Sequence, residues 1–227
     1  MDRAVSLMSE EGFRGFVAIA LPDEIRSRCA RLLTTLRGEA RQVSWVKPGN
    51  LHLTLKFLGS TRPSQAERLL ASLAHKAMKL SPFEVVLGGL GVFPTFRRPR
   101  IIWVGVSEGA GSLEELAAKV EGAAAKAGFS RESRRFSPHL TLGRVKMARR
   151  RSGKPSAQPL SEKRVGEDLE DLQALLGRSD PGALGRFTVR EMVLIESRLS
   201  PGGALYTPLA RVKLGREPGP ATVREGR

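Results

Sequence analysis

The tetrapeptide His-Leu-Thr-Leu occurs twice in this chain, at residues 52–55 and 139–142, and it contains two of the three histidines. A repeat at this separation predicts a duplicated architecture, in which each half of one domain supplies one copy. Both copies lie in apolar runs of β type, so we expect each copy to form part of a strand. The fold must therefore bring two equivalent strands into one structure.

Strand geometry assigns the side chains of each copy to two faces. Successive residues of a strand point to opposite sides, so His52 shares a face with Thr54, and His139 shares a face with Thr141. The leucines of each copy point the other way, into a core. Two such polar faces opposite one another would form a cleft. A single copy would fit an ordinary amphipathic strand equally well, but two identical copies favour a paired-histidine active site.

Paired imidazoles suit phosphoryl transfer. Histidine has an ordinary pKa near ~6.5, so one ring can accept a proton while its partner donates one. An in-line displacement at phosphorus needs a base and an acid on opposite sides, and two similar halves would supply both. The hydroxyls of Thr54 and Thr141 are suited to holding the non-bridging oxygens. This scheme needs no metal and no cofactor.

Four segments of the sequence resemble the two-histidine phosphoesterase superfamily, and within it the bacterial and archaeal RNA 2′,3′-cyclic phosphodiesterases, also called 2′-5′ RNA ligases. They are Phe16–Pro22, Asn50–Gly59, Phe136–Arg144 and Tyr206–Leu209. The resemblance extends over about residues 14–214. It implies an α+β fold of two pseudo-symmetric lobes, each an antiparallel β-sheet with helices on the outside, and an active-site cleft between the lobes.

The resemblance also implies an activity, which is metal-independent hydrolysis of RNA 2′,3′-cyclic phosphate ends to 2′-phosphomonoesters. Because that product keeps the phosphate on the 2′ oxygen, the 3′ oxygen leaves and must be protonated. By resemblance His52 is the proton donor and His139 the proton acceptor. Two alternatives remain open: a 2′-5′ RNA ligase or a cyclic phosphodiesterase acting on small nucleotides or tRNA halves, and a non-catalytic module that binds RNA ends.

Five further residues are candidates for substrate binding. Lys56 is in strand phase with the first histidine and is expected to face the phosphate or the solvent beyond it. Arg144 would share the core face of a regular strand, so Gly143 is expected to mark either a bulge or the end of the strand, and either would turn Arg144 back towards the cleft. Phe96 and Arg100 lie in a loop that alternates aromatics with arginines, which suits single-stranded RNA or a plain turn. Tyr206 is expected to stack near the cleft or to be only a strand aromatic.

The charge balance favours an anionic partner. Lys and Arg number 38 against 23 Asp and Glu, which gives a net charge of +15. Cations placed on phosphates release counterions from a nucleic acid, so RNA with a 2′,3′-cyclic phosphate end suits this surface. A basic surface that serves solubility alone would show the same excess.

Other features limit the setting. Cys29 is the only cysteine and lies at helical spacing with apolar residues, so we expect a buried thiol and no intrachain disulfide. The first apolar run, residues 16–21, is too short to cross a membrane. We expect no signal peptide, no membrane contact, a cytoplasmic location and a monomer. The third histidine, His75, is expected at the surface without a role.

The chain is expected to form one two-lobed domain over residues 1–214, with a charged insertion at about 147–186 and a disordered tail over 215–227. Arg149–Arg151, within the insertion, would either guide RNA to the cleft or lie in a solvated loop. Helices are expected at about 22–37, 63–79, 112–127 and 164–176. Strands are expected at about 14–21, 43–46, 51–58, 83–93, 100–106, 136–146, 187–198 and 205–214.

Overall fold

The structure is a computed structural model that describes residues 12–146, 162–201 and 203–215. The Arg149–Arg151 run and the tail from residue 216 lie outside the described residues. The helices are α2 (Asp23–Glu39), η1 (Pro48–Asn50), α3 (Pro63–Ala77), α4 (Ala110–Lys126) and α5 (Glu162–Ser179). The strands are β1 (Phe13–Ala20), β2 (Val43–Trp45), β3 (His52–Thr61), β4 (Phe83–Phe93), β5 (Ile101–Glu108), β6 (Leu140–Val145), β7 (Ala183–Val189), β8 (Glu191–Ser200) and β9 (Gly203–Lys213).

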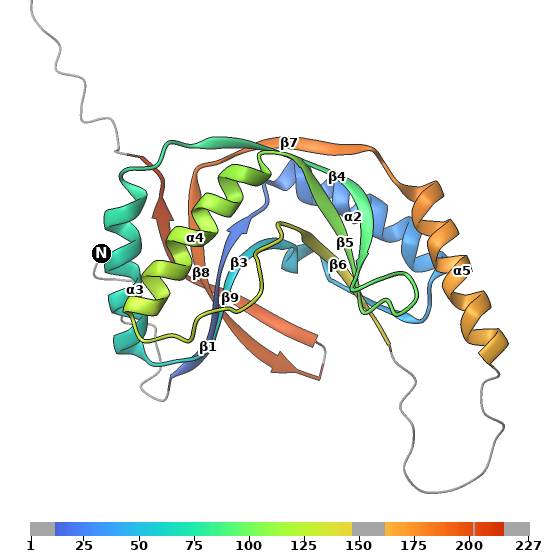
Figure 1. Cartoon of the computed structure of the whole chain (residues 1–227), viewed down its shortest axis with the longest axis horizontal. Helices are drawn as coiled ribbons and strands as arrows, with labels where there is room; N and C mark the ends of the chain where they lie inside the picture. The colour runs from blue at the N-terminus through green and yellow to red at the C-terminus, as the bar shows by residue number, and fades with distance from the viewer. Residues whose placement is uncertain (1–11, 147–161, 202, 216–227) are drawn as a thin grey trace, which may run out of the picture.

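All nine described strands form one antiparallel sheet in the order β7-β4-β5-β6-β3-β1-β8-β9, with β2 paired to β6. The two motif strands, β3 and β6, lie at the centre and are joined by the backbone pair Leu53 and Leu140. We call β3, β1, β8 and β9 the first lobe, and β6, β5, β4, β7 and β2 the second lobe. The sheet curls about this join (Figure 1), so the predicted two-lobed α+β fold is confirmed, with the two sheets continuous.

Two helices cover each lobe on its convex side. Helices α3 and α4 pack against each other and against strands of the first lobe, while α2 and α5 pack against each other and against the second lobe (Figure 1). Each helix buries an apolar stripe at helical spacing, as α4 does with the residues Leu113, Leu116, Ala117, Val120, Ala123 and Ala124. The predicted buried thiol is confirmed, since Cys29 of α2 is 0% exposed and burial raises its pKa to about 11.

Two sequence predictions about the strands are wrong. The run 187–198 is not one strand, because the chain breaks at Arg190 and crosses from β7 in the second lobe to β8 in the first. The continuous apolar pattern hides this break, since both strands face the same core. The second motif strand is also shorter than expected, and the residues from 136 to 139 approach it as an irregular segment.

Candidate active site

The sheet join places the four polar motif side chains together. In the antiparallel pair formed by Leu53 and Leu140, the flanking residues are also neighbours, so His52 lies beside Thr141, and Thr54 lies beside His139. All four share the face opposite to these buried leucines, and all four are at least partly exposed. Burial lowers the pKa of His52, and the positive charge of His139 lowers it further, as expected for two imidazoles in one site.

Backbone carbonyls fix the tautomer of both imidazoles in the same way. His52 Nδ1 lies 2.7 Å from the carbonyl oxygen of Asn50, and His139 Nδ1 lies 2.7 Å from that of Ser137. A carbonyl can only accept a hydrogen bond, so each Nδ1 carries a proton and donates it. Nε2 is therefore the nitrogen of each ring that can exchange a proton with a substrate. Both carbonyls belong to the residue two positions before the histidine, so the two motifs share the same local backbone arrangement.

Aromatic rings pack against each histidine. The ring of His52 lies 4.7 Å from that of Phe16 and 5.4 Å, edge-on, from that of Tyr206. The ring of His139 lies 5.0 Å, edge-on, from that of Phe93. Burial among these groups disfavours the imidazolium and lowers the pKa of both histidines, while the backbone carbonyls oppose this shift. Each ring therefore stays neutral down to a lower pH than a free imidazole does.

Tyr206 lies beside the first motif, as one of the two sequence interpretations required. Strand β8 pairs with β1 over residues 193–196, and beyond that point the β8–β9 hairpin leaves β1 (Figure 1). The side-chain amide of Asn50 donates a 2.8 Å hydrogen bond to the carbonyl of Ala204, which ties the hairpin to the segment before His52. The hairpin therefore brings the Tyr206 ring to the histidine.

Trp103 supports the second motif from the neighbouring strand. It pairs with Thr141 and so lies on the same face of the sheet, and its ring is 5.1 Å from that of Phe93. A Cβ at Gly91 would lie 2.3 Å from the indole, so only glycine leaves room for this ring. Phe93 begins the loop that the sequence offered for substrate contact, but its packing on His139 was not expected. Trp103 was missed, because its position depends on pairing between strands distant in sequence.

The prediction that Lys56 faces the phosphate is wrong. Val17 pairs with Lys56 but Ala18 pairs with Thr54, so β3 carries a bulge at Leu55. The bulge reverses the alternation and turns Lys56 towards the helices, where its side chain is 4% exposed. Its ammonium donates to Glu121 of α4 at 2.7 Å and to the Ser130 carbonyl at 3.0 Å. Phe57, 66% exposed, takes its place on the histidine face.

Of the two alternatives expected before Arg144, the structure shows the bulge. Trp103 pairs with Thr141 but Ile102 pairs with Gly143, so an extra residue lies between them in β6. Arg144 is thereby returned to the face of the second motif and is exposed. Its contact with substrate stays a prediction.

The loop residues Phe96 and Arg100 differ in their surroundings. Phe96 is partly buried and packs against the hydrophobic core, so less of its ring is open to a substrate than that of a fully exposed aromatic residue. Arg100 is exposed and directly precedes Ile101, which pairs with Arg144. Substrate contact by either residue stays a prediction.

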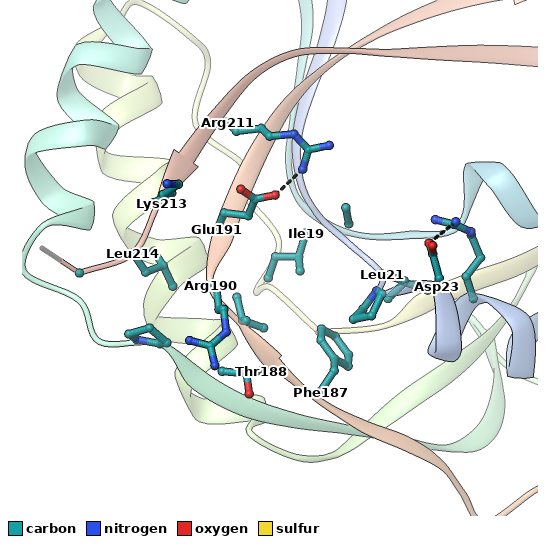
Figure 2. A pocket seen from close by; sticks show the side chains of 16 residues that line it. Ile19, Leu21, Asp23, Phe187, Thr188, Arg190, Glu191, Arg211, Lys213 and Leu214 are labelled. Carbon is teal, nitrogen blue, oxygen red and sulfur yellow. Dashed lines mark hydrogen bonds and ion pairs between the residues drawn. The ribbon is translucent and has the colours of Figure 1, made fainter. Parts of the chain in front are cut away.

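A separate cavity of about 960 Å³ opens where the chain crosses between the lobes (Figure 2). Its walls come from residues 19–23, 187–191, 211 and 213–215, together with Arg26 and Pro82, and neither motif histidine lines it. Two of its arginines are engaged, Arg26 by Asp23 and Arg211 by Glu191. We assign this cavity no part in the chemistry of the histidines.

Two further properties of the described residues bear on the site. They contain no group of three or more His, Cys, Asp or Glu side chains placed to hold a metal ion. In the part of the chain that the structure covers, no helix has the length and apolar character needed to cross a membrane.

An α+β fold whose curled sheet carries one His-x-Thr motif from each lobe, side by side at the join of the lobes, defines a phosphoesterase of the two-histidine class. The model of the LigT like Phosphoesterase family matches the chain twice, over residues 19–103 and 104–206, and the chain belongs to this family. The two matches correspond to the two motif-bearing halves.

Curated relatives and solved structures agree with this family. The chain is 36% identical to the RNA 2′,3′-cyclic phosphodiesterase of Aquifex aeolicus over 172 residues, covering 75% of this chain and 81% of that protein. It is 32% identical to the enzyme of the same name from Methanothermobacter thermautotrophicus over 201 residues, covering 88% and 98%. The crystal structures of E. coli LigT in apo form and of TT0787 from Thermus thermophilus superimpose with TM-scores of 0.65 and 0.68, each at 26% identity; they cover 91% and 90% of this chain and 99% and 100% of their own.

Proposed function

We propose that this protein hydrolyses RNA 2′,3′-cyclic phosphate ends to 2′-phosphomonoesters by general acid–base catalysis with two histidines. The observation that carries the proposal is the identical setting of His52 and His139, each with Nδ1 bound to a carbonyl and Nε2 available, on one face of the two joined motif strands. The names of its curated relatives and the net charge of +15 support RNA as the substrate.

In this mechanism His139 Nε2 takes a proton from water as the water oxygen attacks phosphorus. The bond between phosphorus and the 3′ oxygen breaks, and protonated His52 gives its Nε2 proton to that oxygen. The phosphate stays on the 2′ oxygen. The reaction leaves His139 protonated and His52 neutral, and exchange with solvent restores the starting state.

The threonines complete the mechanism. Thr54 and Thr141 each lie beside the histidine of the other motif, where their hydroxyls can donate to the two non-bridging oxygens. Both oxygens gain negative charge as water attacks, so donors fixed on the sheet stabilise the transition state. We further propose that the protein acts as a monomer, because one chain supplies both motifs, and that it acts in the cytoplasm, where its RNA substrate would be found.

The test is hydrolysis of a short RNA ending in a 2′,3′-cyclic phosphate, in excess chelator, by the wild type and by His52→Ala and His139→Ala. We expect each variant to lose about 10²–10⁴-fold in rate, the range for a general acid or base. His75→Ala is the matched control, because this histidine is exposed on α3, and it should keep full rate. RNA binding by a wild type that does not turn the substrate over would refute the proposal.

A second substrate separates the two histidine roles. Sulfur at the 3′ position leaves without needing a proton, so a 3′-thio analogue of the cyclic phosphate should restore most of the rate of His52→Ala and little of the rate of His139→Ala. The opposite pattern would reverse the roles.

A further inference from the structure

Residues 130–135, Ser-Arg-Glu-Ser-Arg-Arg, connect α4 to the second motif, and we call them the basic segment. Residues 131–135 are all exposed. The segment ends four residues before His139. Its contacts with the first lobe therefore help to position the second motif in space.

The basic segment runs along the outer half of the first motif strand. Strands β3 and β6 are antiparallel, so the residues before Leu140 lie alongside those that follow Leu53. Within the described chain Leu53 and Leu140 are the one backbone pair between these strands, so no backbone pairing joins the basic segment to β3. Lys56, on β3, spans the gap with its hydrogen bond to the carbonyl of Ser130.

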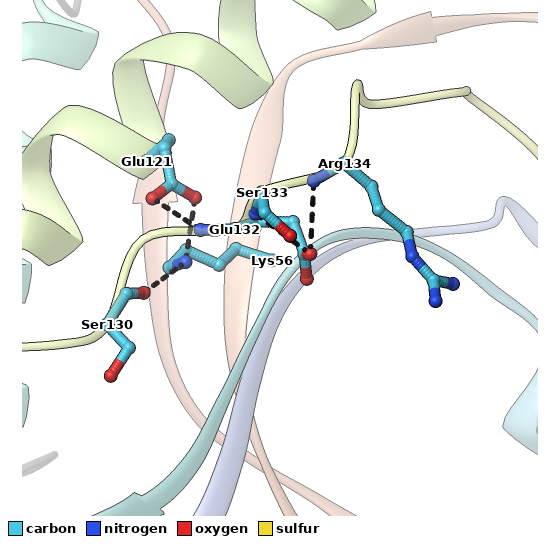
Figure 3. Close-up of polar contacts among 6 residues, drawn as sticks. All are labelled: Lys56, Glu121, Ser130, Glu132, Ser133 and Arg134. Atoms are coloured by element: carbon cyan, nitrogen blue, oxygen red, sulfur yellow. Dashed lines mark hydrogen bonds and ion pairs between the residues drawn. The ribbon is translucent and has the colours of Figure 1, made fainter.

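A chain of carboxylates holds the backbone of the segment (Figure 3). One oxygen of Glu121 accepts the Lys56 ammonium, and the other accepts the backbone N–H of Glu132 at 3.2 Å. The side chain of Glu132 in turn accepts the backbone N–H groups of Ser133 at 3.1 Å and Arg134 at 3.3 Å. The segment is therefore fixed from its first residue to its fifth, although it belongs to no helix or strand.

The arginines of the segment differ in their engagement. Arg135 pairs with Glu114 of α4 at 3.2 Å. For Arg131 and Arg134, the described residues provide no ion pair, and the guanidinium of Arg134 extends away from the carboxylate cluster (Figure 3). A fixed backbone that presents two such side chains loses less conformational entropy on binding than a free loop would.

We propose that the basic segment is a contact for the RNA strand, with Arg131 and Arg134 binding backbone phosphates of the nucleotides that precede the cyclic end. This inference rests on the proposed function and extends it, because it assigns the residues that bind the RNA strand beyond its cyclic end. Glu121 and Lys56 act as positioning residues for the segment.

The test compares two substrates for the variant Arg131→Ala/Arg134→Ala: a short RNA ending in a 2′,3′-cyclic phosphate, and the nucleoside 2′,3′-cyclic phosphate of the same terminal base. We expect kcat/KM to fall about 3–30-fold for the RNA, the combined effect of two exposed ion pairs, and to stay unchanged for the nucleotide. The slope of log kcat/KM against log salt should become shallower by roughly 1.4 for the RNA, since each lost contact to a single strand contributes about 0.7.

The matched control is Arg31→Ala/Lys79→Ala, which removes two exposed cations from the helical side of the molecule. It should leave kcat/KM unchanged for both substrates. Equal losses for both substrates, or losses no larger than those of the control, would overturn the inference. Binding of an RNA that ends in a 2′-phosphate, measured by fluorescence anisotropy, tests the contact without turnover. A wild type that binds this RNA through the two arginines but cleaves neither substrate would contradict the proposed function and leave the contact supported.

Discussion

Removal of Glu121 should destabilise the protein more than removal of its partner Lys56. In Glu121→Met the ammonium stays buried, since the Lys56 side chain is 4% exposed and keeps only the Ser130 carbonyl. An uncompensated buried charge costs about 3–5 kcal/mol, which at about 2–4 °C per kcal/mol for a chain of this size lowers Tm by roughly 6–20 °C. In Lys56→Met the carboxylate keeps the Glu132 N–H and is 24% exposed, so we expect about 1–3 kcal/mol.

The double variant Lys56→Met/Glu121→Met replaces the pair by two apolar side chains of similar length. Such replacements are often close to neutral, so the double variant should be more stable than Glu121→Met alone, with a coupling of about 2 kcal/mol or more. Urea unfolding followed by the fluorescence of the two tryptophans measures all three free energies. Additive costs, or a Glu121→Met variant no less stable than Lys56→Met, would refute the assignment of this pair as a buried clamp.

Four further predictions concern the site and its surroundings. Burial lowers the pKa of His52 below 6.5, and the general acid must be protonated. The pH profile of kcat/KM should therefore fall with rising pH, with the midpoint of this fall below pH 6.5, and a midpoint above 6.5 would contradict the assignment. Both histidines bind fewer protons folded than unfolded, so the free energy of unfolding should fall as pH drops below 6.5, and less so in a His52→Ala/His139→Ala variant, as urea titrations at several pH values would show. Gly91→Ala should cost about 1–3 kcal/mol because its Cβ meets Trp103, whereas Gly111→Ala, which meets nothing within 4 Å, should be neutral or stabilising in the same unfolding assay. Thr54→Val and Thr141→Val should each lower kcat about 10²–10³-fold with little change in Tm, and unchanged kcat would remove the hydroxyls from the mechanism.

The sequence predicted what depends on local periodicity. The repeated motif indicated two lobes and the shared face of its polar residues, and the apolar stripes of the helices placed their buried sides correctly, down to the Cys29 thiol. It failed at Lys56, because strand alternation counts residues and a bulge adds one that only pairing with β1 reveals. At Arg144 a glycine in the strand signalled the bulge in advance. Trp103 and the contact of Phe93 with His139 were missed, because β5 pairs with the second motif strand and β4 with β5 only in the tertiary structure.

Of the described α-helices, α2 and α4 cover a lobe other than that of the strand that precedes them. Helix α2 follows β1 of the first lobe but covers the second, and α4 follows β5 of the second lobe but covers the first (Figure 1). Strands cross as well, since β4 of the first sequence half lies in the second lobe, and β8 and β9 of the second half lie in the first lobe. Each lobe is therefore built from both halves of the sequence, and half of this chain on its own would leave both lobes incomplete with apolar faces exposed to solvent. We therefore expect the two halves to fold and unfold together as one cooperative unit.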